Sequence, residues 1–184
     1  RRYGVCNACG TLLVDQSVAE RFLPELFGML ADKGVRIHGD ELACKAALAA
    51  GEKRLPTDAA LQVERASEQD WETEYLSPEL AVRCVSGPEQ AIAHINRYGT
   101  MHSEAIVADP NLAEGAAAIE RFVNEVDAAA VYVNASTAFT DGGMFGLGAE
   151  IGISTQKLHV RGPFALEGLT SYKYVLRGSG QVRA

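Results

Sequence analysis

Two cysteines near the start of the chain, Cys6 and Cys9, are the side chains best suited to covalent chemistry. A cysteine attacks as its thiolate, which nearby backbone N–H groups or a cation favour. Their C-x-x-C spacing also occurs in redox pairs and zinc sites, but a zinc site needs a second pair of ligands. Cys44 and Cys84 have no partner at such spacing, and the histidines are scattered. The spacing alone is therefore compatible with one reactive cysteine or with two small packing residues.

Cationic side chains alternate near the other end of the chain, at Lys157, His159 and Arg161. In an extended segment, a period of two places all three on one face. Such a face is either the solvated edge of a strand or a site for an anionic ligand, which arginine binds well through paired N–H donors.

The segment from Val131 to Pro163 combines a strand-like run with many glycines, serines and threonines. Glycine lets a backbone approach a ligand closely, so the segment predicts a binding loop. A surface loop with tight turns is the alternative. The spacing of Gly146, Gly148 and Gly152 does not join a strand directly to a helix, which makes a dinucleotide fingerprint a poor interpretation.

Four segments of the chain together resemble the gamma-glutamyl phosphate reductase (glutamate-5-semialdehyde dehydrogenase) family of the aldehyde dehydrogenase superfamily. They are Gly4–Ala8 (GVCNA), Thr11–Val14 (TLLV), the glycine-rich segment, and Ser154–His159 (STQKLH) followed by Arg-Gly-Pro. The resemblance extends from about Gly4 to the end of the chain. It implies the C-terminal, catalytic portion of such an enzyme, with the N-terminal dinucleotide-binding domain absent from this chain.

The resemblance also implies roles for individual residues. Cys6 is the expected nucleophile, and Cys9 a packing residue. Residues 73–78 are similar to the superfamily segment Glu-x-Phe-Gly-Pro, so Glu74 should bind the nicotinamide ribose and Leu76 replaces the aromatic residue. The expected substrate-binding residues are Asn7, His102, Ser136, Thr137, Gly146, Lys157, His159 and Arg161. For His102, a loop histidine bonded to nearby backbone is an equal alternative.

The activity implied is NADPH-dependent reduction of L-glutamyl 5-phosphate to L-glutamate 5-semialdehyde and phosphate through a cysteine thioester, in proline biosynthesis. Two positions depart from the family: Gly10 replaces a usual glutamate and Ala138 a usual arginine. Ala138 favours a second hypothesis, a related acyl-phosphate or aldehyde dehydrogenase with an altered substrate. Both departures and the missing cofactor domain favour a third, a non-catalytic fragment that only assembles with partners.

Composition limits the class of protein. The 184 residues are 47% hydrophobic and 22% charged, which is typical of a globular domain with a sizeable core. The formal net charge of −7 argues against nucleic acid as a partner. No apolar run is long enough for a membrane span, and there is no signal-peptide core. We expect a cytoplasmic protein with reduced thiols, no metal and an anionic small-molecule substrate.

Strand-like and helix-like segments alternate along the chain, which predicts an α/β fold with a mostly parallel sheet flanked by helices. The expected strands are residues 11–14, 35–38, 80–85, 105–108 and 129–133, and the expected helices are residues 18–31, 40–50, 88–98 and 110–126. Residues 51–71 are expected to be irregular.

Two helix starts can be predicted in detail. Ser17 is the expected N-cap of the first helix, with Glu20 at capping-box spacing, and Asp40 should cap the second. The first helix should present Val18, Phe22, Leu26 and Leu30 on one buried face.

At the level of domains, residues 1–160 are expected to form the nucleophile-bearing domain and residues 161–184 a return and oligomerisation segment. In the resembled family this tail pairs with a neighbouring subunit. A terminal strand at residues 181–183, and hence a homo-oligomer, is therefore implied.

Overall fold

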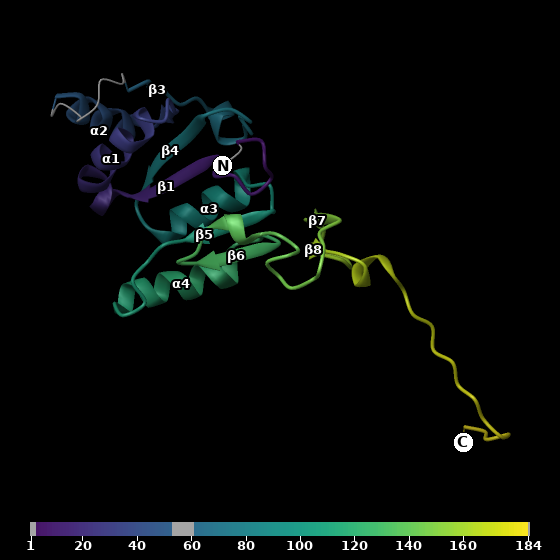
Figure 1. Ribbon diagram of the computed structural model, residues 1–184. Helices are drawn as coiled ribbons and strands as arrows, with labels where there is room; N and C mark the ends of the chain where they lie inside the picture. Colours follow the sequence, from purple (N-terminus) through teal and green to yellow (C-terminus); the bar gives the residue numbers. More distant parts are fainter. Residues whose placement is uncertain (1–2, 53–60, 184) are drawn as a thin grey trace.

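The computed structural model describes residues 3–52 and 61–183. Its first half is built on a four-stranded, fully parallel sheet in the order β1-β4-β2-β3 (Figure 1). The strands are β1 (Thr11–Asp15), β2 (Arg36–Gly39), β3 (Val63–Arg65) and β4 (Glu79–Val85). The α/β prediction with a mostly parallel sheet is therefore confirmed.

Helices cover both faces of this sheet. On one face, α1 (Gln16–Ala31) and α2 (Glu41–Glu52) pack on alternate β4 side chains, Leu80, Val82 and Cys84. On the other face, Arg83 Nη1 lies 2.8 Å from His94 Nδ1 of α3 (Pro88–Tyr98). The alternation follows from the two-residue period of a strand, which sends successive side chains to opposite faces.

The start and the buried face of α1 differ from the prediction. Asp15, not Ser17, caps the helix, because its Oδ1 accepts the Ser17 backbone N–H at 2.9 Å. The fully buried α1 side chains are Leu23 and Phe27, while Phe22 is 42% exposed. The helix carries apolar residues on two adjacent stripes, so its rotation is set by packing against the sheet. Asp40 does cap α2, as predicted, by accepting the Ala43 N–H at 2.9 Å.

The second half of the chain adds a parallel pair, β5 (Ser103–Ile106) and β6 (Ala130–Val133), and helix α4 (Ala113–Glu125). Ile92, Phe122 and Val126 form its own small core. The strand β5 ends earlier and α4 begins later than predicted. Residues 51–71, expected to be irregular, contain β3 and a 3-10 turn, Glu68–Trp71; residues 53–60 lie outside the described residues.

After β6 come a 3-10 turn (Thr137–Phe139), the glycine-rich loop, an antiparallel pair of β7 (Gly152–Ser154) and β8 (Gly162–Phe164), and a last 3-10 turn (Glu167–Leu169). Residues 170–183 then extend away from the body without helix or strand (Figure 1). The terminal strand at 181–183 stays a prediction, because a strand needs a partner. Within the described residues, every helix is too short or too polar to cross a bilayer.

Candidate active site

Cys6 lies on an exposed loop that precedes β1. The loop turns around it, with the Ala8 N–H donating to the Val5 carbonyl at 3.0 Å. Asn7 ties the loop to the distant 137–140 segment: its Nδ2 donates to the Thr140 carbonyl at 3.0 Å, and Thr137 Oγ1 donates to the Asn7 carbonyl at 2.9 Å. Asn7 and Thr137, two predicted site residues, are thus in direct contact beside the cysteine.

The segment after Asn134 begins with a short turn that Ser136 stabilises. Its Oγ accepts the Ala138 N–H at 3.1 Å, which caps the turn at Thr137–Phe139. Thr140 is buried and donates to the Tyr132 hydroxyl at 2.8 Å. These contacts give Ser136 and Thr137 a role in holding the loop that faces Asn7.

The glycine-rich loop closes on itself through its own polar groups. Glu150 Oε2 accepts the Gly142 N–H at 2.8 Å, and a Cβ at Gly142 would lie only 2.3 Å from the Ala149 carbonyl oxygen. Gly146 has a φ of 76°, in the left-handed region that favours glycine. No helix follows directly, so the loop is not a dinucleotide fingerprint within a βαβ unit, as predicted.

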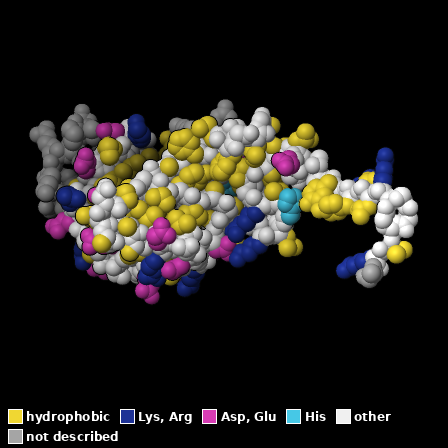
Figure 2. Space-filling view, turned by 90° about the horizontal axis from the view of Figure 1, so that it is seen from below, with side chains coloured by type: hydrophobic (Ala, Val, Ile, Leu, Met, Phe, Trp, Pro, Cys, Tyr) yellow, Lys and Arg dark blue, Asp and Glu magenta, His cyan; other side chains and the backbone are white. Residues whose placement is uncertain are grey.

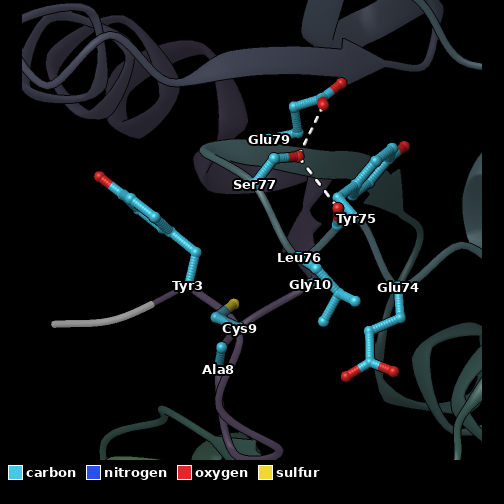
Figure 3. Close-up of a pocket in the computed structure, with 9 residues that line it drawn as sticks. All are labelled: Tyr3, Ala8, Cys9, Gly10, Glu74, Tyr75, Leu76, Ser77 and Glu79. Atoms are coloured by element: carbon cyan, nitrogen blue, oxygen red, sulfur yellow. Dashed lines mark hydrogen bonds between the residues drawn. The ribbon is translucent and has the colours of Figure 1, made fainter.

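A pocket separates the start of the chain from the 74–79 segment (Figure 3). Glu74 and Leu76, the predicted cofactor residues, lie on one wall, and both are exposed. The opposite wall belongs to the loop before β1. The residues that line the pocket are Tyr3, Ala8, Cys9, Gly10, Glu74, Tyr75, Leu76, Ser77 and Glu79.

Cys9 is exposed at this pocket, so its assignment to packing was wrong. Although the residue as a whole is exposed, its thiol is close enough to protein to be desolvated. This desolvation, with the negative charge of Glu104, raises the pKa of the Cys9 thiol. A raised pKa leaves less thiolate at neutral pH, which makes Cys9 the poorer nucleophile. The exposed thiol at Cys6 remains the better candidate.

His102 is buried immediately before β5, 9% exposed. Its Nδ1 is 2.9 Å from Ser103 Oγ, and its Nε2 has no hydrogen-bond partner among the described residues. Burial lowers the pKa of His102, while the charges of Glu150 and Glu74 oppose the shift. A neutral ring with one free nitrogen is suited to hydrogen-bonding a polar ligand.

The segment that carries the three cations is bent at residues 157–159, so the prediction of one extended, cationic face was wrong. Lys157 Nζ and Arg161 Nη2 instead converge on Asp127, at 2.7 and 2.8 Å from its two carboxylate oxygens. Hydrogen bonds from Lys157 and Arg161 lower the pKa of Asp127. His159 is exposed on the bend. Sequence reasoning missed Asp127, because nothing in its local pattern marks it as a shared partner.

Among residues 3–52 and 61–183, no cluster of three or more His, Cys, Asp or Glu side chains could hold a metal ion. The structure brings three pairs of the predicted residues together. Asn7 is hydrogen-bonded to Thr137, Glu74 and Leu76 line the same pocket, and Lys157 and Arg161 share an ion pair with Asp127.

The chain is similar in sequence and structure to gamma-glutamyl phosphate reductases. No family model matches the chain. Over 183 residues it is 51% identical to the gamma-glutamyl phosphate reductase of Bacillus mycoides and 52% identical to that of Caldanaerobacter subterraneus. The crystal structure of gamma-glutamyl phosphate reductase from Thermotoga maritima matches the whole chain with a TM-score of 0.85 and 46% identity. The chain spans 40% of the length of each of these three proteins.

Proposed function

We propose that this chain forms the C-terminal catalytic portion of a gamma-glutamyl phosphate reductase, with Cys6 as its nucleophile. The observation that carries the proposal is the exposed Cys6 beside Asn7, which is hydrogen-bonded to the start of the glycine-rich loop. Similarity over the whole chain to reductases of that name supports it. The activity is NADPH-dependent conversion of L-glutamyl 5-phosphate to L-glutamate 5-semialdehyde and phosphate, a step of proline biosynthesis.

The chemistry of the chain itself centres on one thiolate. Cys6 Sγ attacks the acyl carbon, a C–S bond forms, and the bond from that carbon to the phosphate oxygen breaks, which leaves a thioester and free phosphate. The Cys6 backbone N–H is a candidate donor for the oxyanion that develops. After reduction of the thioester carbon, the C–S bond breaks, the aldehyde leaves and the thiolate is restored.

The pocket at Glu74 fits part of a nicotinamide cofactor, which we propose to be NADP. The exposed Glu74 carboxylate can accept hydrogen bonds from two ribose hydroxyls. Leu76, 61% exposed, offers an apolar surface beside it. The reduced cofactor, when bound, supplies the hydride for the thioester.

We assign the polar ends of the substrate to the remaining predicted residues. His102 offers its free Nε2, and Ser136 and Gly146 belong to the loop that faces Asn7. Lys157 and His159 are exposed near the β7–β8 pair, and Arg161 is more enclosed; Lys157 and Arg161 are both paired with Asp127. Lys157 and His159 are therefore the more accessible partners for a carboxylate or phosphate.

The decisive experiment changes the nucleophile in the intact gene product. Cys6→Ser should abolish NADP-dependent, phosphate-stimulated oxidation of glutamate semialdehyde, because a serine hydroxyl stays protonated at neutral pH. Cys9→Ser is the matched control and should keep most activity. An active Cys6→Ser together with an inactive Cys9→Ser would refute the assignment.

The substrate profile separates the alternatives. Oxidation of other aldehydes in preference to glutamate semialdehyde would indicate a related dehydrogenase with an altered substrate, the hypothesis that Ala138 favours. A wild-type protein without any dehydrogenase activity would support the third hypothesis, in which the chain is non-catalytic and only assembles with partners.

We also propose that the tail mediates a homo-oligomer. Tyr172, Tyr174 and Leu176 are 84%, 84% and 90% exposed along its extended course. Figure 2 shows hydrophobic side chains on the face of the body seen from below and again on the projecting tail. An exposed apolar segment of this kind is expected to bury its side chains against another chain.

A further inference from the structure

A polar network that includes part of the pocket wall has no role in the reaction described above. Its centre is His38, in β2 and largely buried. His38 Nε2 lies 2.8 Å from Glu79 Oε2, and His38 Nδ1 lies 3.2 Å from Asp70 Oδ1. One imidazole therefore bridges two carboxylates, one before and one after the segment that carries Glu74 and Leu76.

The network holds the inward-facing side chains of this segment. The Tyr75 ring stacks on the His38 ring, with centroids 4.8 Å apart and an angle of 12° between the planes. The Tyr75 hydroxyl donates to Asp70 Oδ1 at 2.7 Å. Ser77 Oγ lies 2.7 Å from Glu79 Oε1 and 3.0 Å from the Tyr75 carbonyl (Figure 3).

Exposed and partly buried residues alternate along this segment, although all of them line the pocket. Tyr75 and Ser77 are partly buried and bonded, while Glu74 and Leu76 are exposed on the pocket wall. Leu76 has a φ of 55°, a left-handed conformation that a branched side chain adopts only when its neighbours hold it there. The conformation that presents Glu74 and Leu76 thus depends on the contacts of Tyr75 and Ser77.

Both carboxylates of the network are kept ionised. Hydrogen bonds from Ser77 and His38 lower the pKa of Glu79. Burial opposes ionisation of Asp70, but hydrogen bonds from Ser67 and Tyr75 outweigh it and lower the pKa of Asp70. Arg36 Nη1, 3.9 Å from Glu79 Oε2, is a further positive charge nearby. His38 thus lies between two ionised carboxylates, with Nε2 in hydrogen-bond contact with Glu79 and Nδ1 at ion-pair distance from Asp70.

We propose that His38 is a positioning residue: through Asp70, Tyr75 and Glu79 it fixes the segment that presents Glu74 and Leu76 to the nicotinamide cofactor. That the ligand is a nicotinamide cofactor rests on the proposed function, whereas the role of His38 in fixing the segment does not. Contacts to ionised groups are stronger than neutral ones, so a side chain held between two ionised carboxylates can set the geometry of a short segment.

The test compares His38→Gln with a matched control, Tyr98→Phe, in the intact gene product. Gln can contact one carboxylate but cannot bridge both or stack on Tyr75. The control removes the Tyr98 hydrogen bond to Glu68, which joins the nearby 3-10 turn to α3. In His38→Gln, amide hydrogen exchange over residues 72–79 should become about tenfold faster, as expected for loss of one charge-assisted contact. Tyr98→Phe should leave exchange there unchanged.

The kinetic readout is a split between Michaelis constants. In His38→Gln the KM for NADPH should rise about tenfold, whereas the KM for glutamyl phosphate should stay close to the wild-type value. A purely structural role would lower the melting temperature and the active fraction but leave both constants unchanged. Unchanged exchange over residues 72–79, or an unchanged KM for NADPH, in a folded His38→Gln protein overturns the proposal.

The outcomes also separate this proposal from the function it builds on. If the wild-type product does not use NADPH but exchange in His38→Gln is faster, the proposed function fails and the fixing of the segment stands. If His38→Gln does not fold, Tyr75→Phe removes the contact to Asp70 while keeping the ring stack. It should raise exchange and the KM for NADPH in the same direction, by a smaller factor, and no change in either would equally overturn the proposal.

Discussion

At the scale of single residues, the four cysteines occupy different surroundings and should react at different rates. Cys6 is exposed. The pKa of Cys9 is raised by desolvation and by Glu104, and burial with the charge of Asp40 raises that of Cys84 to about 12. Mild iodoacetamide treatment followed by peptide mass spectrometry should therefore find Cys6 labelled first. If Cys9 is labelled before Cys6, the C-x-x-C has to be interpreted as a redox pair.

Ala138 gives a second residue-scale prediction. It lies partly buried beside Thr137, in the turn that contacts Asn7, where the resembled family usually has arginine. Ala138→Arg should lower the KM for glutamyl phosphate roughly tenfold or more, since a charge-assisted hydrogen bond contributes about 1.5–3 kcal/mol. Ala138→Met, similar in length but uncharged, is the control. Equal effects of the two variants would show that the added volume, not the charge, is responsible.

At the scale of elements, two substitutions in α1 can show which face of this helix contributes to stability by packing on the sheet. Phe27 is fully buried, so Phe27→Ala should cost about 3–5 kcal/mol of unfolding free energy in urea titrations. Phe22, 42% exposed, is the control, and Phe22→Ala should change stability by only about 0.5 kcal/mol. A larger loss of stability in Phe22→Ala than in Phe27→Ala would mean that the face predicted from periodicity alone is the buried one.

The same helix shows how far sequence determines such elements. The run of apolar residues at 80–85 identified β4, because a central parallel strand is buried on both faces. On α1, however, apolar residues lie on two neighbouring faces of the helix. The periodicity of the sequence therefore predicted the face of Phe22, whereas the structure buries the face of Phe27. The three-residue strands β3, β7 and β8 were missed because they exist through their partners: β3 pairs with β2, and β7 with β8.

The candidate site was predictable mainly through family resemblance. Charge alternation predicted one cationic face, but Asp127, which is distant in sequence, draws Lys157 and Arg161 together across a bend. The contact of Asn7 with Thr137 joins residues 130 positions apart, which local periodicity cannot reveal. Glu74 and Leu76 line a pocket, but their role with the cofactor stays a prediction; Tyr75 and Ser77 could have been found as their partly buried neighbours in an alternating pattern.

At the scale of the whole molecule, Glu104 should make stability depend on pH. Burial raises its pKa from 4.5 to about 7, so between these values the folded state binds more protons than the unfolded state. Its contribution to stability is therefore complete below pH 4.5 and is lost as pH rises through about 7. Glu104→Gln should match wild type at pH 4.5 and be more stable at pH 8 in urea unfolding.

The comparison with wild type is needed because His94 acts in the opposite direction. Burial and the charge of Arg83 lower the pKa of His94 from 6.5 to about 4, so its contribution rises with pH over that interval. The difference between Glu104→Gln and wild type removes this shared term. A difference that does not change between pH 4.5 and 8 would contradict the role of Glu104.

The tail supplies a second prediction at this scale. Removing residues 170–184 should lower the molecular mass of the particle measured by light scattering after size exclusion, because exposed apolar side chains of the tail are lost. Replacing Lys173 and Arg177 by Gln keeps those side chains and serves as the control. An unchanged mass after truncation would mean that other surfaces hold the subunits together.

The two hydrogen bonds of Asn7 also impose an order of events during synthesis. The Cys6 loop leaves the ribosome before its partners, because Thr137 and Thr140 are translated 130 and 133 residues after Asn7. Until they emerge, the nascent loop has nothing to close against, and its thiol is carried by an open chain. The loop that holds Cys6 is therefore synthesised well before the residues that close on it, and during that interval its thiol stays within reach of cellular oxidants and chaperones.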